Sequence, residues 1–134
     1  MKSGQLRVYI GAATGAGATY AMLDEALRRK GRGTHITIGW VDTHSRRNTL
    51  DVLERVTDGQ PSPESLDVQS IIAEQPDVVL VDDLGRQIGD SFHWILVDEI
   101  LKSGIDVIAT LNMQHIASLA EPVAEIIGAQ PDGR

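Results

Sequence analysis

The chain has 134 residues, of which 42% are hydrophobic, and a formal net charge of -7 at pH 7. This length allows one domain with a buried core, and we expect residues 1–134 to form a single domain. The chain has no cysteine, which excludes disulfides and thiolate metal sites. No apolar run approaches the length of a membrane span, so we expect a cytoplasmic protein without direct membrane insertion.

The acidic balance argues against nucleic acid as a partner, because phosphate backbones repel an acidic surface. The densest basic cluster comprises Arg28, Arg29, Lys30 and Arg32. It falls at the end of a predicted helix, where cations are favoured by the helix dipole. We interpret the cluster as a helix end rather than as a binding surface.

Two kinds of apolar pattern alternate along the chain. Short apolar runs predict strands over 6–10, 35–41, 77–81 and 105–110. Apolar residues at helical spacing predict helices over 19–30, 47–56, 66–76, 91–102 and 119–127. The second of these helices carries Leu50, Leu53 and Val56, and the fourth carries Phe92, Ile95, Leu96 and Ile100. Residues 57–65, rich in Gly, Pro and Ser, predict a loop. The alternation predicts an α/β fold of three layers, with a mainly parallel sheet covered by helices.

A glycine-rich segment joins the first predicted strand to the first helix. It has the layout of a P-loop, with Ala12 at the opening glycine position, matches at Gly17 and Thr19, and Ala18 where the pattern has lysine. Such loops bind phosphate through backbone N–H groups and the helix N-terminus. The expected nucleotide-binding residues here are Gly11, Ala12, Ala13, Thr14, Gly15, Ala16, Gly17, Ala18 and Thr19. The alternative is a tight turn without a ligand.

The third predicted strand ends in two acids. Four apolar residues followed by Asp82 have the Walker B form, in which the acid and the Thr19 hydroxyl hold Mg²⁺. Asp83 is the candidate catalytic residue, at the position where many ATPases carry a glutamate that orients water. The alternative is a pair of acids that caps the next segment.

Other polar residues follow the second and fourth predicted strands. Asn112 and Gln114 either sense a γ-phosphate or hold backbone in place, and His44 and His115 are a metal or acid–base pair or bond to loops. We favour loop bonds for the histidines and a core position for Trp40 rather than base stacking. Three arginines are candidates to replace the missing lysine charge: Arg46, Arg47 and, as first choice, Arg86.

Several blocks resemble one family. Residues 11–23, 39–44, 81–84, 104–107 and 112–115 resemble, in order, segments of the N-terminal cytoplasmic domain of KdpD-type osmosensitive potassium-sensor histidine kinases. That family has proline in place of Thr14 and lysine in place of Ala18, and its segments corresponding to 57–65 and 84–91 are longer.

The resemblance implies a regulatory P-loop module that binds ATP or ADP with Mg²⁺ and contacts a sensor kinase or another signalling protein. In the family, this domain precedes a universal-stress-type domain, a membrane region and a kinase core, and ATP is thought to tune the kinase-to-phosphatase balance. No kinase core occurs in these 134 residues, so we expect a cut-out domain or a free-standing relative, and no histidine kinase activity. With Ala18, the ATP site is expected to be degenerate, with weak or absent binding and little hydrolysis. The alternatives are a small ATPase with a substitute cation and a nucleotide-free adaptor.

Overall fold

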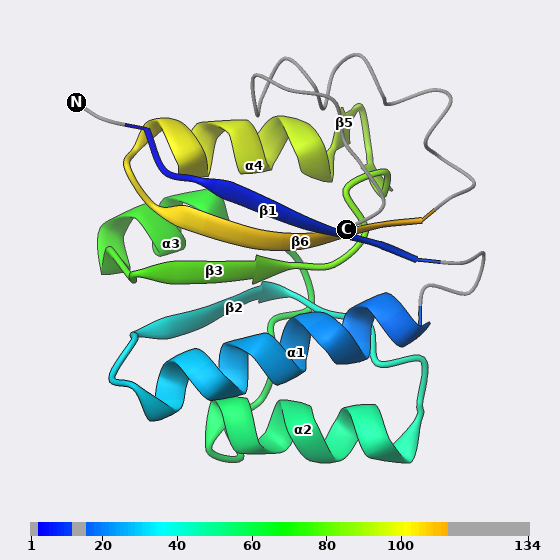
Figure 1. Cartoon of the computed structure of the whole chain (residues 1–134). Helices are drawn as coiled ribbons and strands as arrows, with labels where there is room; N and C mark the ends of the chain where they lie inside the picture. Colours follow the sequence, from blue (N-terminus) through cyan, green and yellow to red (C-terminus); the bar gives the residue numbers. More distant parts are fainter. Residues whose placement is uncertain (1–2, 12–15, 113–134) are drawn as a thin grey trace.

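The computed structural model describes residues 3–11 and 16–112 (Figure 1). Its elements are β1 (Leu6–Gly11), α1 (Ala16–Gly31), β2 (Ile36–Trp40), α2 (Arg47–Thr57), α3 (Val68–Glu74), β3 (Val78–Val81), β4 (Gln87–Ile88), β5 (Ser91–Phe92), α4 (His93–Lys102) and β6 (Asp106–Asn112). The helix predicted over 119–127 lies outside the described residues.

Four of the strands form a parallel sheet in the order β1-β6-β3-β2. This confirms the mainly parallel sheet predicted from the sequence. Strand β6 lies between β1 and β3, so that Thr110 is opposite Tyr9 and Ala109 is opposite Val81. The carboxyl ends of all four strands therefore meet at one edge.

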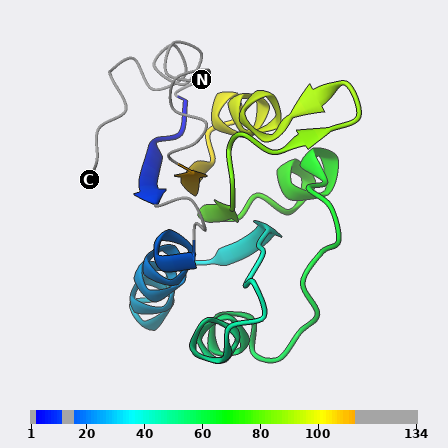
Figure 2. The same ribbon diagram turned by 90° about the vertical axis from the view of Figure 1, so that its right-hand side faces the viewer.

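Helices cover both faces of this sheet (Figure 2). Alternate residues of β3 belong to different apolar clusters, because successive side chains of a strand point to opposite faces. Val79 and Val81 pack in a cluster with side chains of α3 and α4. Val78 and Leu80 pack in a second cluster with side chains of α1 and α2. The three-layer α/β architecture is thus confirmed.

Helix α1 begins at Ala16, earlier than the predicted start at Thr19. Ala18 and Thr19 consequently lie near its amino end, where both are buried. Gly31 follows the last basic residues of the helix and ends it, and Gly33 has a φ of 93°. None of the helices in the described part of the chain is long and apolar enough to cross a membrane.

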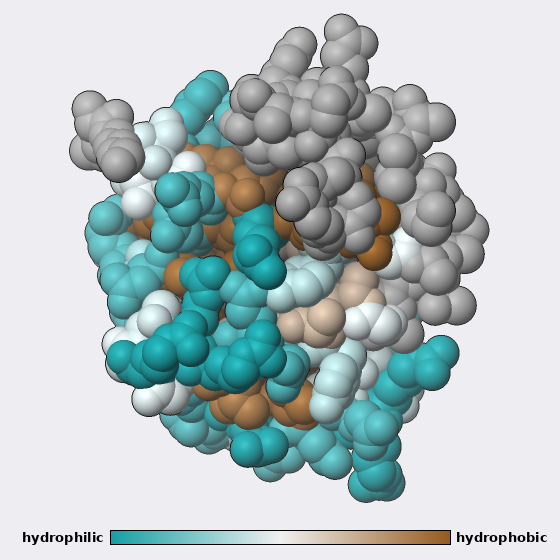
Figure 3. All heavy atoms as spheres, in the orientation of Figure 1, coloured by the Kyte–Doolittle hydropathy of each residue, from teal (hydrophilic) through white to brown (hydrophobic). Residues whose placement is uncertain are grey.

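Three of the four residues in the basic cluster, Arg28, Arg29 and Lys30, lie in the last turn of α1 and pair with nearby carboxylates. Arg28 pairs with Asp24, and Arg29 Nη2 lies 2.6 Å from Glu25. Lys30 Nζ lies 2.7 Å from Asp58. These pairs confirm the interpretation of the cluster as a helix end. Hydrophilic side chains cover much of this side of the molecule, with apolar side chains between them (Figure 3).

Two predicted helix faces were partly wrong. In α2, Leu50 is 45% exposed, whereas Val56 is buried as expected. The buried stripe includes Thr49 and Val52 instead, and a pattern based on apolar residues underrates a buried threonine. In α4, Ile95 is 36% exposed, and Val97 is buried.

Residues 84–90, for which no helix or strand was predicted, form a small hairpin together with Ser91 and Phe92, which were predicted as the start of a helix. Gln87 pairs with Phe92 and Ile88 with Ser91 in an antiparallel ladder. Gly89, with a φ of 58°, lies in the turn. Strands of two residues leave no detectable alternation in a sequence, which explains why the hairpin was missed.

Candidate functional site

A small polar cavity of about 60 Å³ lies at the carboxyl edge of the sheet. Four segments contribute to it, namely the start of α1 and the residues at or beyond the ends of β2, β3 and β6. Its lining residues are Ala18, Thr19, Trp40, Asp42, His44, Asp82, Asp83, Arg86, Thr110, Leu111 and Asn112. This volume has room for an ion with a few waters.

Asp82 lines this cavity and is only 3% exposed. The Thr19 hydroxyl is 3.0 Å from both of its carboxylate oxygens, and the Asp42 backbone N–H donates to Oδ2 at 3.0 Å. The Thr110 hydroxyl donates to Oδ1. Burial raises the pKa of Asp82, and these hydrogen bonds oppose the rise.

No lysine or arginine of the described residues forms an ion pair with Asp82. A buried carboxylate without a cation is costly, even when hydrogen bonds stabilise it. The site therefore has the electrostatic character of a cation site.

Thr110 connects the two acids that follow β3. Its hydroxyl donates to Asp82 and accepts a hydrogen bond of 2.7 Å from the Asp83 N–H. Its carbonyl oxygen accepts from Leu84 N at 2.8 Å. Because β6 lies beside β3, this threonine fixes the turn from the neighbouring strand.

His93 holds the same turn from the opposite side. Its ring is fully buried, and Nδ1 lies 3.0 Å from the Asp82 carbonyl oxygen and 3.1 Å from that of Asp83. Two acceptors at one nitrogen require the proton on Nδ1. Asp83 itself has a left-handed backbone, with a φ of 58°, a conformation that costs free energy for a non-glycine residue. His93 and Thr110 together stabilise this conformation.

Trp40 and Arg86 form one wall of the cavity. The indole belongs to the apolar core, as the sequence predicted, and its Nε1 donates to the Glu64 carbonyl oxygen at 3.1 Å. The Arg86 guanidinium lies 4.2 Å from the centroid of the Trp40 ring, a cation–π contact. Arg86 thus lines the same cavity as Ala18.

The loop after β2 is built on Asp42. The Asp42 carboxylate accepts a hydrogen bond of 2.8 Å from the His44 N–H, and both His44 and Ser45 have a φ of 56°. This bond is made by the His44 backbone, and the His44 side chain lines the cavity, so the loop bonds favoured for this histidine stay a prediction. Its predicted partner His115 lies outside the described residues.

The oxygen donors fit Mg²⁺ better than they fit a transition metal. Within the described residues there is no group of three or more His, Asp and Glu side chains placed to hold a metal ion. Mg²⁺ needs few protein ligands, because it keeps several waters and is often bound by one or two carboxylates and phosphates. Neighbouring ligand oxygens around octahedral Mg²⁺ are about 3.0 Å apart, and the Thr19 hydroxyl lies 3.0 Å from each Asp82 oxygen.

The structure brings together most of the predicted site residues that it describes. Ala18, Thr19, Asp82, Asp83, Arg86 and Asn112 all line the cavity. Gly17 lies beside it on α1, and Gly11 ends β1. The predicted loop residues Ala12, Ala13, Thr14 and Gly15, and also Gln114, lie outside the described residues, and Ala16 opens α1.

Sequence reasoning missed the roles of Thr110 and His93. A hydroxyl at the end of an otherwise apolar strand was a weak signal for Thr110. Nothing in the local pattern of α4 distinguishes His93, because its acceptors come from another strand end.

The parallel sheet and the polar cavity at its carboxyl edge define the chain as a three-layer α/β domain with a site in the usual place for this class. Residues 2–134 match the family model described as KdpD, osmosensitive K⁺ channel His kinase sensor domain. The chain belongs to this family, which confirms the resemblance found in the sequence.

Relatives with high similarity carry the name Sensor protein KdpD. The protein from Mycobacterium tuberculosis (strain CDC 1551 / Oshkosh) is 42% identical over 142 residues, which cover 96% of this chain and 16% of that protein. The Escherichia coli K12 protein is 36% identical over 140 residues, covering 95% of this chain and 16% of that protein. This chain thus spans about a sixth of the length of these relatives.

Proposed function

We propose that this chain is the nucleotide-responsive sensor module of a KdpD-type potassium or osmotic two-component system, located in the cytoplasm. Its ligand is ATP or ADP with Mg²⁺, and its partner is a sensor kinase or another signalling protein. The observation that carries the proposal is the buried Asp82 carboxylate, which has hydroxyl and N–H donors around it and no basic ion-pair partner within the described residues.

Each group at the cavity has a role in this proposal. Asp82 and Thr19 hold Mg²⁺, and the amino end of α1 contributes partial positive charge toward phosphate. Asn112, at the end of β6, contacts the phosphates. Bound Mg²⁺ would bridge phosphate oxygens and neutralise their charge.

Ala18 makes the proposed site weak. A lysine there would supply a charge-assisted hydrogen bond, worth about 1.5–3 kcal/mol, or about 10–100-fold in affinity. Its contribution to phosphoryl transfer is larger, because the transition state gains charge. We therefore expect weak nucleotide binding and little hydrolysis, with Asp83 as the residue that would orient water.

A small ATPase with a substitute cation is the second candidate. The position of Arg86 in the same cavity as Ala18 favours it. To test it, phosphate release from ATP is measured, and this candidate predicts release by the parent that disappears in Asp82→Asn and in Arg86→Ala. A folded parent protein without turnover would exclude this candidate and leave the sensor proposal intact.

Calorimetric titration tests the main proposal. MgATP and MgADP are titrated into the parent protein and into Ala18→Lys, with Asp82→Asn as the variant that lacks the metal ligand. We expect weak binding by the parent, binding about tenfold or more tighter by Ala18→Lys, and a large loss in Asp82→Asn. Absence of binding by both folded parent and Ala18→Lys contradicts the proposal.

A further inference from the structure

A second concavity lies on the other side of the first turns of α1. It is an open hollow of about 730 Å³, lined by Gly17 and Tyr20 of α1 and by Arg46, Arg47, Asn48 and Thr49. Ala18 and Thr19, by contrast, line the small cavity. The start of α1 therefore separates two sites of different size.

The two sites differ in charge. Three carboxylates line the small cavity, those of Asp42, Asp82 and Asp83. The lining residues described for the hollow include two arginines and no acid. A site that attracts a cation next to a site that attracts an anion suits a ligand made of a metal cation and an anionic group.

Arg46 and Arg47 are also not neutralised by the described part of the protein. Neither forms an ion pair there, whereas Arg28, Arg29 and Lys30 are all paired with carboxylates. Arg32, Arg55 and Arg86 also form no ion pair within the described residues, but Arg46 and Arg47 are adjacent in the chain and line one hollow. Arginine also presents a fork of donors that suits phosphate oxygens.

The start of α2 adds to this positive field. Arg46 is its N-cap residue, its side chain makes no capping hydrogen bond, and the first turn contains no acid. The first N–H groups of the helix thus lack a side-chain acceptor. The two arginines and the next two residues of α2, Asn48 and Thr49, line the same hollow.

We propose that this hollow, defined by Arg46, Arg47, Asn48 and Tyr20, is a phosphate subsite in which the two arginines supply the positive charge that Ala18 lacks. The inference rests on the proposed function and deepens it. The small cavity holds the metal ion and the phosphate oxygens nearest to it, and the larger hollow has room for the rest of the phosphate chain. The ligand class is a polyphosphate ester in complex with a divalent cation.

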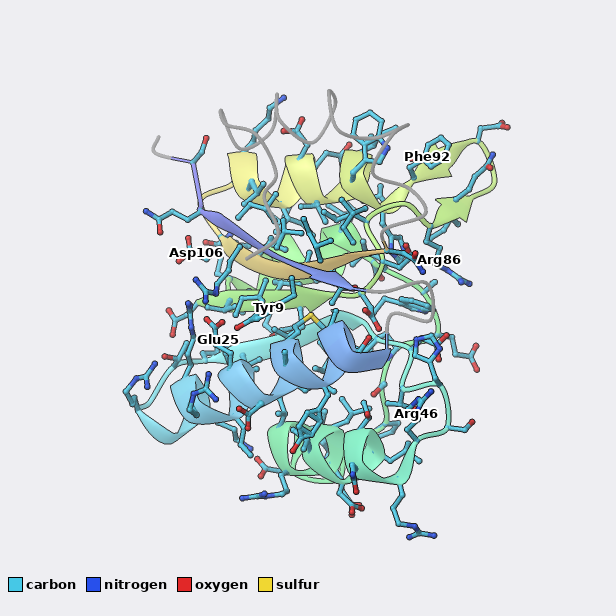
Figure 4. The ribbon with its side chains drawn as sticks, turned by 45° about the vertical axis from the view of Figure 1, so that its right-hand side comes forward. Tyr9, Glu25, Arg46, Arg86, Phe92 and Asp106 are labelled. Carbon is cyan, nitrogen blue, oxygen red and sulfur yellow. The ribbon has the colours of Figure 1, made fainter. Side chains whose placement is uncertain are left out.

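This assignment differs from the sequence prediction, which favoured Arg86. Arg86 lies toward the β4–β5 hairpin, and Arg46 lies on the side of α1 and α2 (Figure 4). Arg86 is engaged by the Trp40 ring at 4.2 Å. Moving it onto a phosphate would sacrifice that contact, whereas Arg46 and Arg47 have no ion pair within the described residues to break.

The test compares two double variants with the same change in charge. Arg46→Ala/Arg47→Ala removes the proposed subsite. Arg32→Ala/Arg55→Ala removes two exposed arginines that do not line the hollow. Affinities for MgATP, for Mg²⁺ with inorganic tripolyphosphate and for Mn²⁺ alone are measured by calorimetry, with circular dichroism to verify folding. Arg46→Lys/Arg47→Lys, which keeps the charge, serves if the alanine variant does not fold.

We expect the Arg46→Ala/Arg47→Ala variant to bind MgATP about tenfold or more weakly, while Mn²⁺ binding stays unchanged and the control stays close to the parent. The affinity of Arg46→Lys/Arg47→Lys for MgATP should lie between those of the parent and of the alanine variant. If the protein binds tripolyphosphate as well as ATP, it recognises the phosphates. If it binds ATP alone, it also makes a contact to the nucleoside.

Equal affinities of parent and Arg46→Ala/Arg47→Ala overturn the inference, as does an equal loss in the control. Either result leaves the proposed function intact. If Ala18→Lys binds MgATP and the parent does not, the arginines fail to replace the lysine, and the chain keeps the nucleotide site without the proposed nucleotide response. If neither binds, both proposals are wrong.

Discussion

The Thr19 hydroxyl lies 3.0 Å from both carboxylate oxygens of Asp82, although the two residues are 63 positions apart in the chain. One residue comes from the start of α1 and the other from the end of β3. The hydroxyl and the carboxylate meet in the cavity, so a cation that binds either group also reaches the other.

Replacement of Thr19 by valine removes this hydroxyl and preserves the shape of the side chain. We expect the affinity for Mn²⁺ to fall by about tenfold, as one ligand and one donor to Asp82 are lost. Thr49→Val is the matched control, because Thr49 is also buried, at 3% exposed, and does not line the cavity. The Mn²⁺ affinities of the two variants are measured by titration, with electron paramagnetic resonance as the detection method. An unchanged affinity in Thr19→Val would remove Thr19 from the metal site.

Glu25 should contribute stability that depends on pH. Burial alone would raise its pKa, but the hydrogen bond from Tyr9 and the charges of Arg29 and Arg7 lower it below its ordinary value of 4.5. Tyr9 and Glu25 lie close together beside α1 (Figure 4). A lowered carboxyl pKa stabilises the fold above the unfolded value, and this contribution is lost as the pH falls through the folded value.

Glu25→Gln is therefore expected to reduce the free energy of unfolding by about 1–3 kcal/mol at pH 7. The difference from the parent should shrink as the pH falls below about 4.5. Urea unfolding of the parent and of Glu25→Gln at several pH values measures this difference in the free energy of unfolding. A difference that is the same at pH 7 and pH 3 would mean that the carboxylate charge plays no part.

His93 should make the protein sensitive to mild acid. Burial lowers its pKa, although the carbonyl oxygens of Asp82 and Asp83 partly oppose this. The unfolded chain therefore binds a proton below about pH 6.5 while the folded chain does not, and stability falls as the pH drops below that value.

His93→Gln removes this acid sensitivity. At pH 8 we expect it to cost about 1–3 kcal/mol, because the carbonyl oxygens of Asp82 and Asp83 lose a buried donor. His35→Gln, on an exposed side chain, is the control and should keep the parent's pH dependence between pH 8 and 5. Chemical unfolding across this range distinguishes the variants. A parent that is equally stable at both ends of the range contradicts the prediction.

Gly39 in β2 should not tolerate a side chain. A Cβ atom there would lie 2.8 Å from Leu66 Cδ1 and 2.9 Å from Val79 Cγ1. Gly39→Ala is expected to cost about 1–3 kcal/mol. Gly31→Ala at the end of α1, where a Cβ meets nothing within 4 Å, should be neutral or stabilising. Thermal unfolding gives the melting temperatures of the two variants, and equal values would contradict the prediction for Gly39.

The strands were predictable because their signal is local. Residues 78–81 form an unbroken apolar run, as a strand covered on both faces requires, and the sheet is parallel because helices separate the strands. The position of Asp82 at the carboxyl edge of the sheet followed from the same reasoning. Thr19 and Asp82 could be predicted to lie at the same site because the loop and the strand that carry them match a known pattern.

The remaining features depend on contacts between distant segments. Nothing near Thr110 in the sequence reveals that β6 lies between β1 and β3, which brings its hydroxyl to Asp82 and Asp83. The buried side of α2 includes Thr49, and apolar patterns give threonine little weight. The roles of His93 and of the hollow beside Arg46 likewise depend on strand and helix ends that meet only in the folded protein.

The strand order has a consequence for how the protein is made. Within the described sheet, β1 pairs only with β6, and these are the first and the last of its four strands in chain order. During synthesis β1 must therefore wait for about a hundred more residues before it can pair, and long-range parallel pairing forms slowly. The cavity closes around Asp82 in the same step, because Thr110 arrives with β6. Ligand binding by a nascent chain would consequently report that the sheet is complete.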